Sequence, residues 1–141
     1  MNYSEYDLEC IAKVEFLLER SIKIQGVAIL SEEEKCDNDI INGIKLLHYE
    51  LWNLILHKNS YSIIYVKNRY FIDKKYKIIS SCYLCVLYEC RDCPLQIHGY
   101  GECHSKSLYG CVDNENYYVR MAARKIIRDI FKEEDKWLKY L

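Results

Sequence analysis

A cysteine-rich stretch between Cys82 and Cys103 holds the residues of this sequence that are best suited to chemistry. Five of the eight cysteines lie in it, and four of them form two Cys-x-x-Cys pairs. Two residues between thiolates allow both sulfur atoms to reach one ion at about 2.3 Å, the usual zinc–sulfur distance. The stretch therefore predicts a structural zinc site, with five candidate ligands: Cys82, Cys85, Cys90, Cys93 and Cys103.

Four of these five cysteines would complete a closed tetrahedral shell, and the spacing leaves the choice among them open. Only four residues separate Cys85 from Cys90, so a site that used both pairs would place two turns almost back to back. A set of four that includes Cys103 avoids this: Cys82, Cys85, Cys93 and Cys103, or the same set with Cys90 in place of one member. The reserve ligands are His98, His104 and Cys111.

Three other interpretations of the cysteines stay open. Disulfides require an oxidising compartment, whereas the N-terminal residues have neither the basic start nor the apolar core of a secretory signal. An iron–sulfur cluster is suggested by Cys85-x4-Cys90-x2-Cys93, but the Gly and Ala residues that let a backbone wrap a cluster are absent between them. The third is free or redox-active thiols, and buried thiols are expected for Cys10 and Cys36.

Length and composition indicate one domain, since the chain has 141 residues, half of them apolar, and a single proline. No apolar run approaches the ~20 residues of a membrane helix, so we expect a cytoplasmic protein without a membrane partner. The net charge is −1, but residues 1–50 carry 11 acidic and 5 basic side chains, and the remainder 10 and 15. This asymmetry is typical of a partner surface or of two mutually attracting halves.

Apolar residues at helical spacing predict two helices in the N-terminal half. The first is expected over about residues 4–21. The second begins at Ser31, which forms a capping box with Glu34, and its apolar spacing continues to about His57. A kink is expected in it at one of two places, Asp37-Asn38 or Gly43.

Residues 61–79 are rich in β-branched and aromatic side chains with turn-like breaks, which favours short strands or a hairpin. Cations alternate there with aromatic rings: Lys67, Arg69, Lys74, Lys75 and Lys77 with Tyr65, Tyr70, Phe71 and Tyr76. Such a mixture stacks bases and follows phosphates in proteins that bind single strands. The alternative is an exposed hairpin with an inner aromatic face.

A clear amphipathic helix is predicted over residues 115–132. We expect its inner face to hold Val119, Ala122, Ala123, Ile126, Ile127 and Ile130. Four cations fall on one line at intervals of four residues, where like charges repel mildly. They are candidate partner-binding residues, either for an anionic partner or as a solvated face balanced by the acidic N-terminal half: Arg120, Arg124, Arg128 and Lys132.

Together these elements predict an α+β fold that is mainly α, with amphipathic helices, a short β element and a metal-stapled cysteine-rich loop. Within one domain of residues 1–141, the parts would be a helical half over 1–58, the zinc-type loop over 80–111 and the C-terminal helix.

The cysteine motifs and the final helix resemble a group of small phage-encoded and prophage-encoded cysteine-rich proteins. The resemblance covers roughly residues 80–131 and rests on Cys-x-Leu-Cys at 82–85, Cys-x-x-Cys-Pro-Leu at 90–95, a Gly-containing loop to Cys103, Tyr109, and the helix with Arg120, Ala123 and Lys125. It implies a zinc site, a bacterial cytoplasmic setting and a phage accessory role.

Three functions are compatible with these patterns. A non-enzymatic binding protein is favoured, because a closed thiolate shell leaves zinc no open position for chemistry. In view of the resemblance, its expected partner is a host protein or ribonucleoprotein. The most concrete form of such a protein is an anti-CRISPR-like inhibitor. The alternative is a nucleic-acid-binding zinc protein. The third is a zinc deaminase. The signature of these enzymes is imitated by His48-Tyr-Glu50 together with Cys82 and Cys85, although no proline precedes either cysteine pair.

Overall fold

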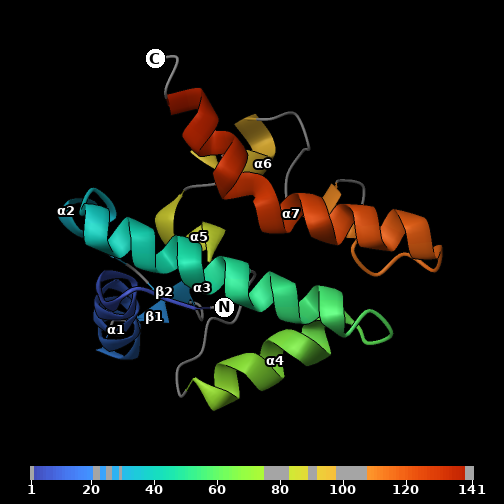
Figure 1. Cartoon of the computed structure of the whole chain (residues 1–141), viewed down its shortest axis with the longest axis horizontal. Coiled ribbons are helices and arrows are strands. Elements are labelled where there is room, and N and C mark those ends of the chain that lie inside the picture. The colour runs from blue at the N-terminus through green and yellow to red at the C-terminus, as the bar shows by residue number, and fades with distance from the viewer. Residues whose placement is uncertain are drawn as a thin grey trace. The chain divides into compact units, whose positions relative to one another are not determined.

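The computed structural model describes residues 2–20, 23–24, 27–28, 30–74, 83–88, 92–97 and 108–138. Figure 1 shows its elements, which are in chain order α1 (Glu5–Arg20), β1 (Lys23–Ile24), β2 (Val27–Ala28), α2 (Glu32–Lys35), α3 (Asn38–His57), α4 (Ile63–Asp73), α5 (Leu84–Leu87), α6 (Pro94–Ile97), the 3-10 turn η2 (Leu108–Cys111) and α7 (Tyr117–Leu138). The Cα positions group into two compact units. Unit 1 is Met1–His48 with Asn68–Leu87, and unit 2 is Tyr49–Lys67 with Tyr88–Leu141. A single domain over residues 1–141 stays a prediction.

The fold is helical, so the predicted α+β class is wrong. Within the described ranges, strand pairing is confined to β1 and β2, which are two residues long each and antiparallel. Strands of this length form no β layer. The β element expected over residues 61–79 is a helix as far as Asp73, and residues 75–79 lie outside the described residues.

Helix α4 shows why the strand prediction was wrong. Its buried side chains repeat at helical intervals and are 3–6% exposed: Ile63, Val66, Tyr70 and Phe71. Three apolar residues of the same helix face outward and are 61–68% exposed: Ile64, Tyr65 and Ile72. The β-branched composition favours a strand, but this spacing places the buried residues on one helical face. The hydroxyl of Ser62 begins the helix by accepting the Tyr65 N–H at 3.3 Å.

The N-terminal helices form close to where the sequence predicts them. Helix α1 confirms the first helix, and the capping box of Ser31 and Glu34 is present at the start of α2. The second helix is broken, however, rather than kinked. Asp37 Oδ1 accepts the Asp39 N–H at 2.9 Å and so caps a new helix, α3.

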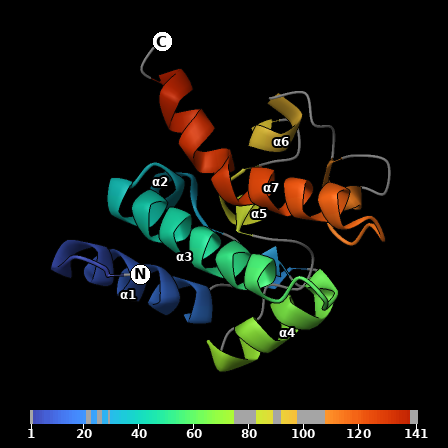
Figure 2. The same ribbon diagram turned by 45° about the vertical axis from the view of Figure 1, so that its right-hand side comes forward.

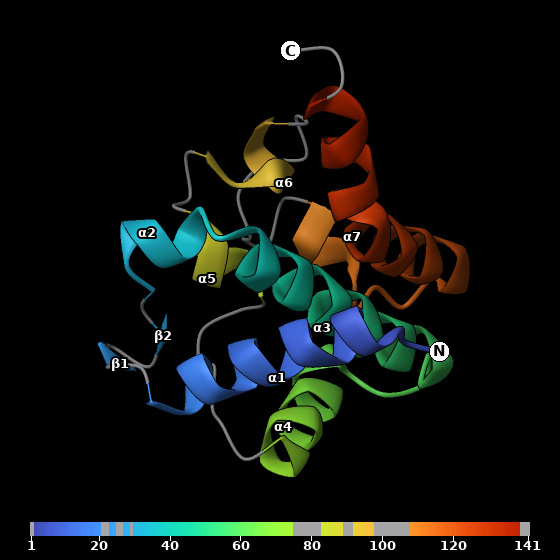
Figure 3. The same cartoon turned by 60° about the vertical axis from the view of Figure 1, so that its left-hand side comes forward.

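Within unit 1, α1 lies beside the N-terminal half of α3 (Figure 3). The two helices approach so closely at Gly43 that a Cβ atom there would lie 2.5 Å from the carbonyl oxygen of Cys10 and 2.6 Å from a methyl carbon of Val14. Polar bonds join the helices at both sides of this contact: Tyr6 to Asp39 at 2.6 Å, Lys13 to Asp37 at 2.8 Å and Asn42 to Asp7 at 3.1 Å.

Helix α7 dominates unit 2, where it contacts α6 and η2 (Figure 2). The predicted helix is confirmed, and Ala123, Ile127 and Ile130 are buried as expected. Val119 and Ala122 are exposed and Ile126 is half-buried, contrary to expectation, whereas Arg124 beside Ala123 is fully buried. Among the described helices, none combines the length and the apolar character needed to cross a membrane.

The close approach of α1 and α3 predicts that Gly43→Ala destabilises the protein. Alanine normally favours a helix interior over glycine by about 1 kcal/mol. Here the added methyl group would meet the backbone of Cys10, so we expect the free energy of unfolding to fall by about 1–3 kcal/mol. Urea denaturation measures this, with Glu9→Ala on the exposed side of α1 as the control. A Gly43→Ala protein more stable than the wild type would contradict the contact.

Candidate functional site

The predicted zinc ligands fall largely outside the described residues. Cys85 lies in α5 of unit 1, and Cys93 directly precedes α6 in unit 2. The other candidates and reserves outside the described residues are Cys82, Cys90, Cys103, His98 and His104; Cys111 ends η2. In the part of the chain that the structure describes, no group of three or more His, Cys, Asp or Glu side chains could hold a metal. The zinc site stays a prediction.

The deaminase-like residues are not assembled among the described residues either. His48 is fully buried in α3, and Cys82 lies outside the described residues. His48 and Cys85 belong to no metal-binding group within those residues.

The cations and aromatic rings that alternate after residue 64 do not form one exposed surface, because helix α4 places several of them in the interior. Lys67 is largely buried and its Nζ donates to the Tyr109 hydroxyl at 3.0 Å. Tyr70 and Phe71 are also buried, so they offer no face to a base. Lys74 lies 3.7 Å from a carboxylate oxygen of Glu15, and Lys75, Tyr76 and Lys77 lie outside the described residues.

Arg124, one of the four predicted partner-binding cations, has no exposed surface. Its Nε donates to Val112 O at 2.6 Å, Nη1 to Ile55 O at 3.0 Å, and Nη2 to Tyr61 O and Asp113 Oδ1, both at 2.9 Å. Burial lowers the pKa of this guanidinium, and the hydrogen bond and charge of Asp113 oppose that change. A side chain enclosed in this way cannot contact a partner, so Arg124 is removed from the partner-binding set.

Arg128 and Lys132 lie farther along α7, around the ring of Tyr49. The Arg128 carbon Cζ is 5.3 Å and the Lys132 Nζ 4.7 Å from the ring centroid. Arg128 also binds both oxygens of Asp129, at 3.0 and 3.3 Å, and this hydrogen bonding raises its pKa. Lys132 keeps the most exposed charge of the line, with 63% of its side chain exposed. Three of the four predicted partner-binding cations, Arg124, Arg128 and Lys132, therefore contact groups of the same chain.

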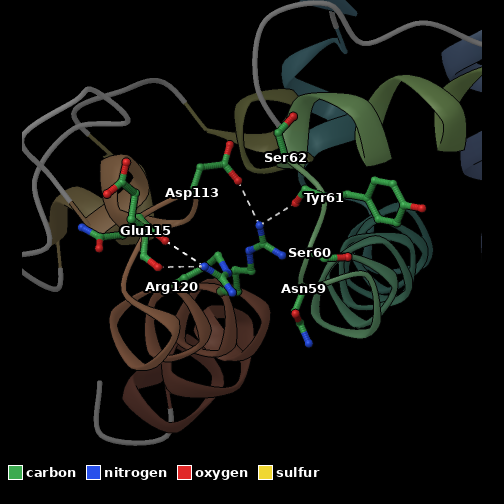
Figure 4. A pocket seen from close by; sticks show the side chains of 9 residues that line it. Asn59, Ser60, Tyr61, Ser62, Asp113, Glu115 and Arg120 are labelled. Atoms are coloured by element: carbon green, nitrogen blue, oxygen red, sulfur yellow. Dashed lines mark hydrogen bonds and ion pairs between the residues drawn. The ribbon is translucent and has the colours of Figure 1, made fainter.

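Arg120, the remaining member of the line, lies at a polar pocket of about 200 Å³ in unit 2. The loop before α4, the loop before α7 and the first turns of α7 line it (Figure 4): Asn59, Ser60, Tyr61, Ser62, Asp113, Asn114, Glu115, Arg120 and Arg124. Asp113 and Ser62 lie on one side of it, and the ring of Tyr61 points away from Arg120.

Asp113 and Arg124 fix both loops of this pocket. Asp113 accepts the backbone N–H of Ile63 with Oδ1 at 3.0 Å and Oδ2 at 3.3 Å, so it caps the first residue of α4. Arg124 binds the carbonyl of Ile55 in the last turn of α3, where helical carbonyls lack partners in the helix itself. One ion pair, with 2.9 Å between Arg124 Nη2 and Asp113 Oδ1, therefore secures the end of one helix and the start of the next.

Exposed rings surround the pocket. Tyr61 stacks on Tyr65 with ring centroids 5.3 Å apart, and the Arg120 carbon Cζ lies 5.7 Å from the ring centroid of Tyr117. Tyr117 in turn contacts Tyr118 edge-on at 5.5 Å. Of these four tyrosines, only Tyr65 was a candidate from the sequence, whereas Tyr61, Tyr117 and Tyr118 were missed. The sequence did contain a signal for Tyr117 and Tyr118. They begin the C-terminal helix and lie outside its predicted apolar face, so the periodicity already placed both rings in solvent.

Asp113→Ala tests the ion pair that fixes the pocket. The substitution leaves the fully buried Arg124 without its carboxylate and Ile63 N–H without its acceptor. Because Asp113 itself is 39% exposed, we expect a loss of roughly 2–4 kcal/mol in the free energy of unfolding, measured by urea denaturation. Asp129→Ala removes the partner of the less buried Arg128 and should cost under about 1 kcal/mol. Equal losses for the two variants would contradict the proposed role of Arg124.

The arrangement offers hydrogen-bond donors, one incompletely bonded cation and exposed aromatic rings, which are groups suited to binding. Comparisons of this chain with protein-family models, with curated proteins and with solved structures found no match.

Proposed function

We propose that this chain is a non-enzymatic binding protein that engages a host protein through the pocket and the tyrosines around it. The observation that carries the proposal is the gathering of exposed rings at this place. Of the ten large apolar side chains exposed among the described residues, six lie in the two segments that border the pocket: Tyr61, Ile64, Tyr65, Tyr117, Tyr118 and Val119. Tyrosine and arginine are enriched at protein interfaces and dominate their binding energy.

The contacts described above support one continuous surface. Tyr65 stacks on Tyr61, Tyr61 and Arg120 both line the pocket, and Arg120 lies against Tyr117. Tyrosine provides a large contact area at a small cost in side-chain entropy, because its ring turns about two bonds only. We name this set, Tyr61, Tyr65, Tyr117, Tyr118 and Arg120, the tyrosine rim.

Nucleic-acid binding, the alternative, has less support. Affinity for phosphates depends on cations free to approach them. Arg124 is buried, Arg128 is paired with Asp129, and Lys67 donates to Tyr109. The rings of the tyrosine rim remain able to stack, but few cations accompany them.

The cellular setting of the proposal comes from the resemblance of residues 80–131 to phage-encoded and prophage-encoded proteins. On that basis the chain acts in the cytoplasm of a bacterial host as a phage accessory protein, with an anti-CRISPR-like inhibitor of host defence as the most concrete form. A structural zinc ion bound by four of the five clustered cysteines would staple the segment between α5 and η2.

Partner capture with matched variants tests the tyrosine rim. Tyr118 is 80% exposed, so Tyr118→Ser should preserve stability and reduce recovery of the partner from a bacterial lysate at least tenfold. The control is Phe16→Ser, which removes a ring that is 55% exposed on α1 of unit 1. Mass spectrometry identifies and quantifies what each variant retains. Equal recovery by wild type, Tyr118→Ser and Phe16→Ser would exclude the rim as the binding surface.

Elemental analysis of the purified chain tests the zinc proposal. We expect one zinc ion per chain in the wild type, and loss of zinc with a fall of several kcal/mol in stability for Cys93→Ser, because metal binding is coupled to folding. Cys36 lies outside the cluster and is exposed, whereas a buried thiol was expected there, so Cys36→Ser should change neither quantity. Wild-type protein without zinc would refute the proposal, and a zinc-replete, stable Cys93→Ser variant would remove Cys93 from the ligands.

A further inference from the structure

The pocket of unit 2 contains two guanidinium groups, and one of them lacks a carboxylate. Asp113 neutralises Arg124, whereas Arg120 forms no ion pair within the described residues. Arg120 Nη1 donates to the backbone carbonyls of Asn114 at 3.0 Å and Glu115 at 3.4 Å, which hold the side chain in place. Its Nε is buried and has no hydrogen-bond partner among the described residues.

This Nε is a charged donor whose hydrogen-bonding capacity the described residues leave unmet. A buried donor on a charged group is unfavourable when it has no acceptor, so an acceptor supplied by a ligand would be stabilising. Since Nη1 is held by the two carbonyls, the edge formed by Nε and Nη2 is the part of the fork left for another acceptor. A carboxylate fits such an edge with two parallel hydrogen bonds.

The charges around the pocket permit an anion there. The positive charge of Arg120 contributes to lowering the pKa of Arg124, after the larger effect of burial, so the two cations repel one another. Asp113 Oδ1 is already shared by Arg124 and Ile63 N–H. Glu115 is exposed and forms no ion pair with Arg120 in the described part of the chain, so it does not neutralise that cation.

Size restricts what can enter. The pocket of about 200 Å³ is smaller than the 300–1,000 Å³ typical of sites for whole small molecules. Its dimensions suit one side chain or one chain end, and Asn59 and Ser60 supply further polar groups at its wall.

We propose that the pocket binds a carboxylate, presented by an acidic side chain or by the C-terminus of the protein partner, with Arg120 as its ligand. The identity of the presenting partner rests on the function proposed for the tyrosine rim. The affinity of the pocket for a carboxylate does not depend on that function and is measured without the partner.

The test follows the Nε–Hε resonance of each arginine by ¹H–¹⁵N NMR of the full chain. Sodium acetate is titrated at constant ionic strength, with chloride as the balancing anion. The Arg120 signal should shift saturably, because a bound oxygen would become the missing acceptor. The Arg128 signal is the internal control, since its Nε already donates to Asp129 at 3.0 Å.

Further titrations separate the sources and the alternatives. N-acetylglutamate α-amide offers a side-chain carboxylate and N-acetylalanine a terminal one; the tighter of the two identifies the source. In Arg120→Lys, which keeps the charge but not the fork, the saturable shifts of the Asn114 and Glu115 amides should disappear. Non-saturating shifts that are equal at Arg120 and Arg128 would overturn the proposal, as would tighter binding of inorganic phosphate than of acetate. If acetate binds but partner capture fails, the carboxylate site in the pocket would stand and the tyrosine rim would be refuted as a partner-binding surface.

Discussion

The buried guanidinium of Arg124 is the interaction on which the described part of unit 2 depends. A charge without exposed surface is tolerable only when it is paired and hydrogen-bonded, and four hydrogen bonds, one of them to the carboxylate of Asp113, supply this. The acceptors come from the last turn of α3, the loop before α4 and the loop before α7. Because one rigid fork binds all three segments, their backbone positions are mutually fixed.

Asp113 supplies the negative charge that pairs with Arg124. It accepts the first N–H of α4, where the helix dipole favours a negative group, and it balances the buried cation. A loop of five residues between α3 and α4 is thereby held at both ends. The walls of the pocket are formed by these same loops, so the pocket is a product of the capping pair rather than of hydrophobic packing.

The sequence contains enough information for elements whose signals are local. The capping box at Ser31 and the apolar periodicity of α7 lie within a few residues of the structure they specify, and both were predicted. The cap of α4 is different, because Asp113 lies 50 residues away from Ile63. Because this capping partner could not be recognised in the sequence, the β-branched composition of the segment favoured strands over its helical spacing in the prediction. The even spacing of Arg120, Arg124 and Arg128 likewise cannot show which cation is buried, since the acceptors of Arg124 belong to other segments.

The contact of α1 with α3 at Gly43 has a consequence for how this sequence can change over time. Most core positions accept several side chains of similar volume, so their identity drifts between relatives. A position where two backbones touch accepts a hydrogen atom alone, and its occupant is fixed as long as the crossing is kept. A larger side chain at residue 43, with Cys10 and Val14 facing it, therefore requires a change in how α1 and α3 pack against each other.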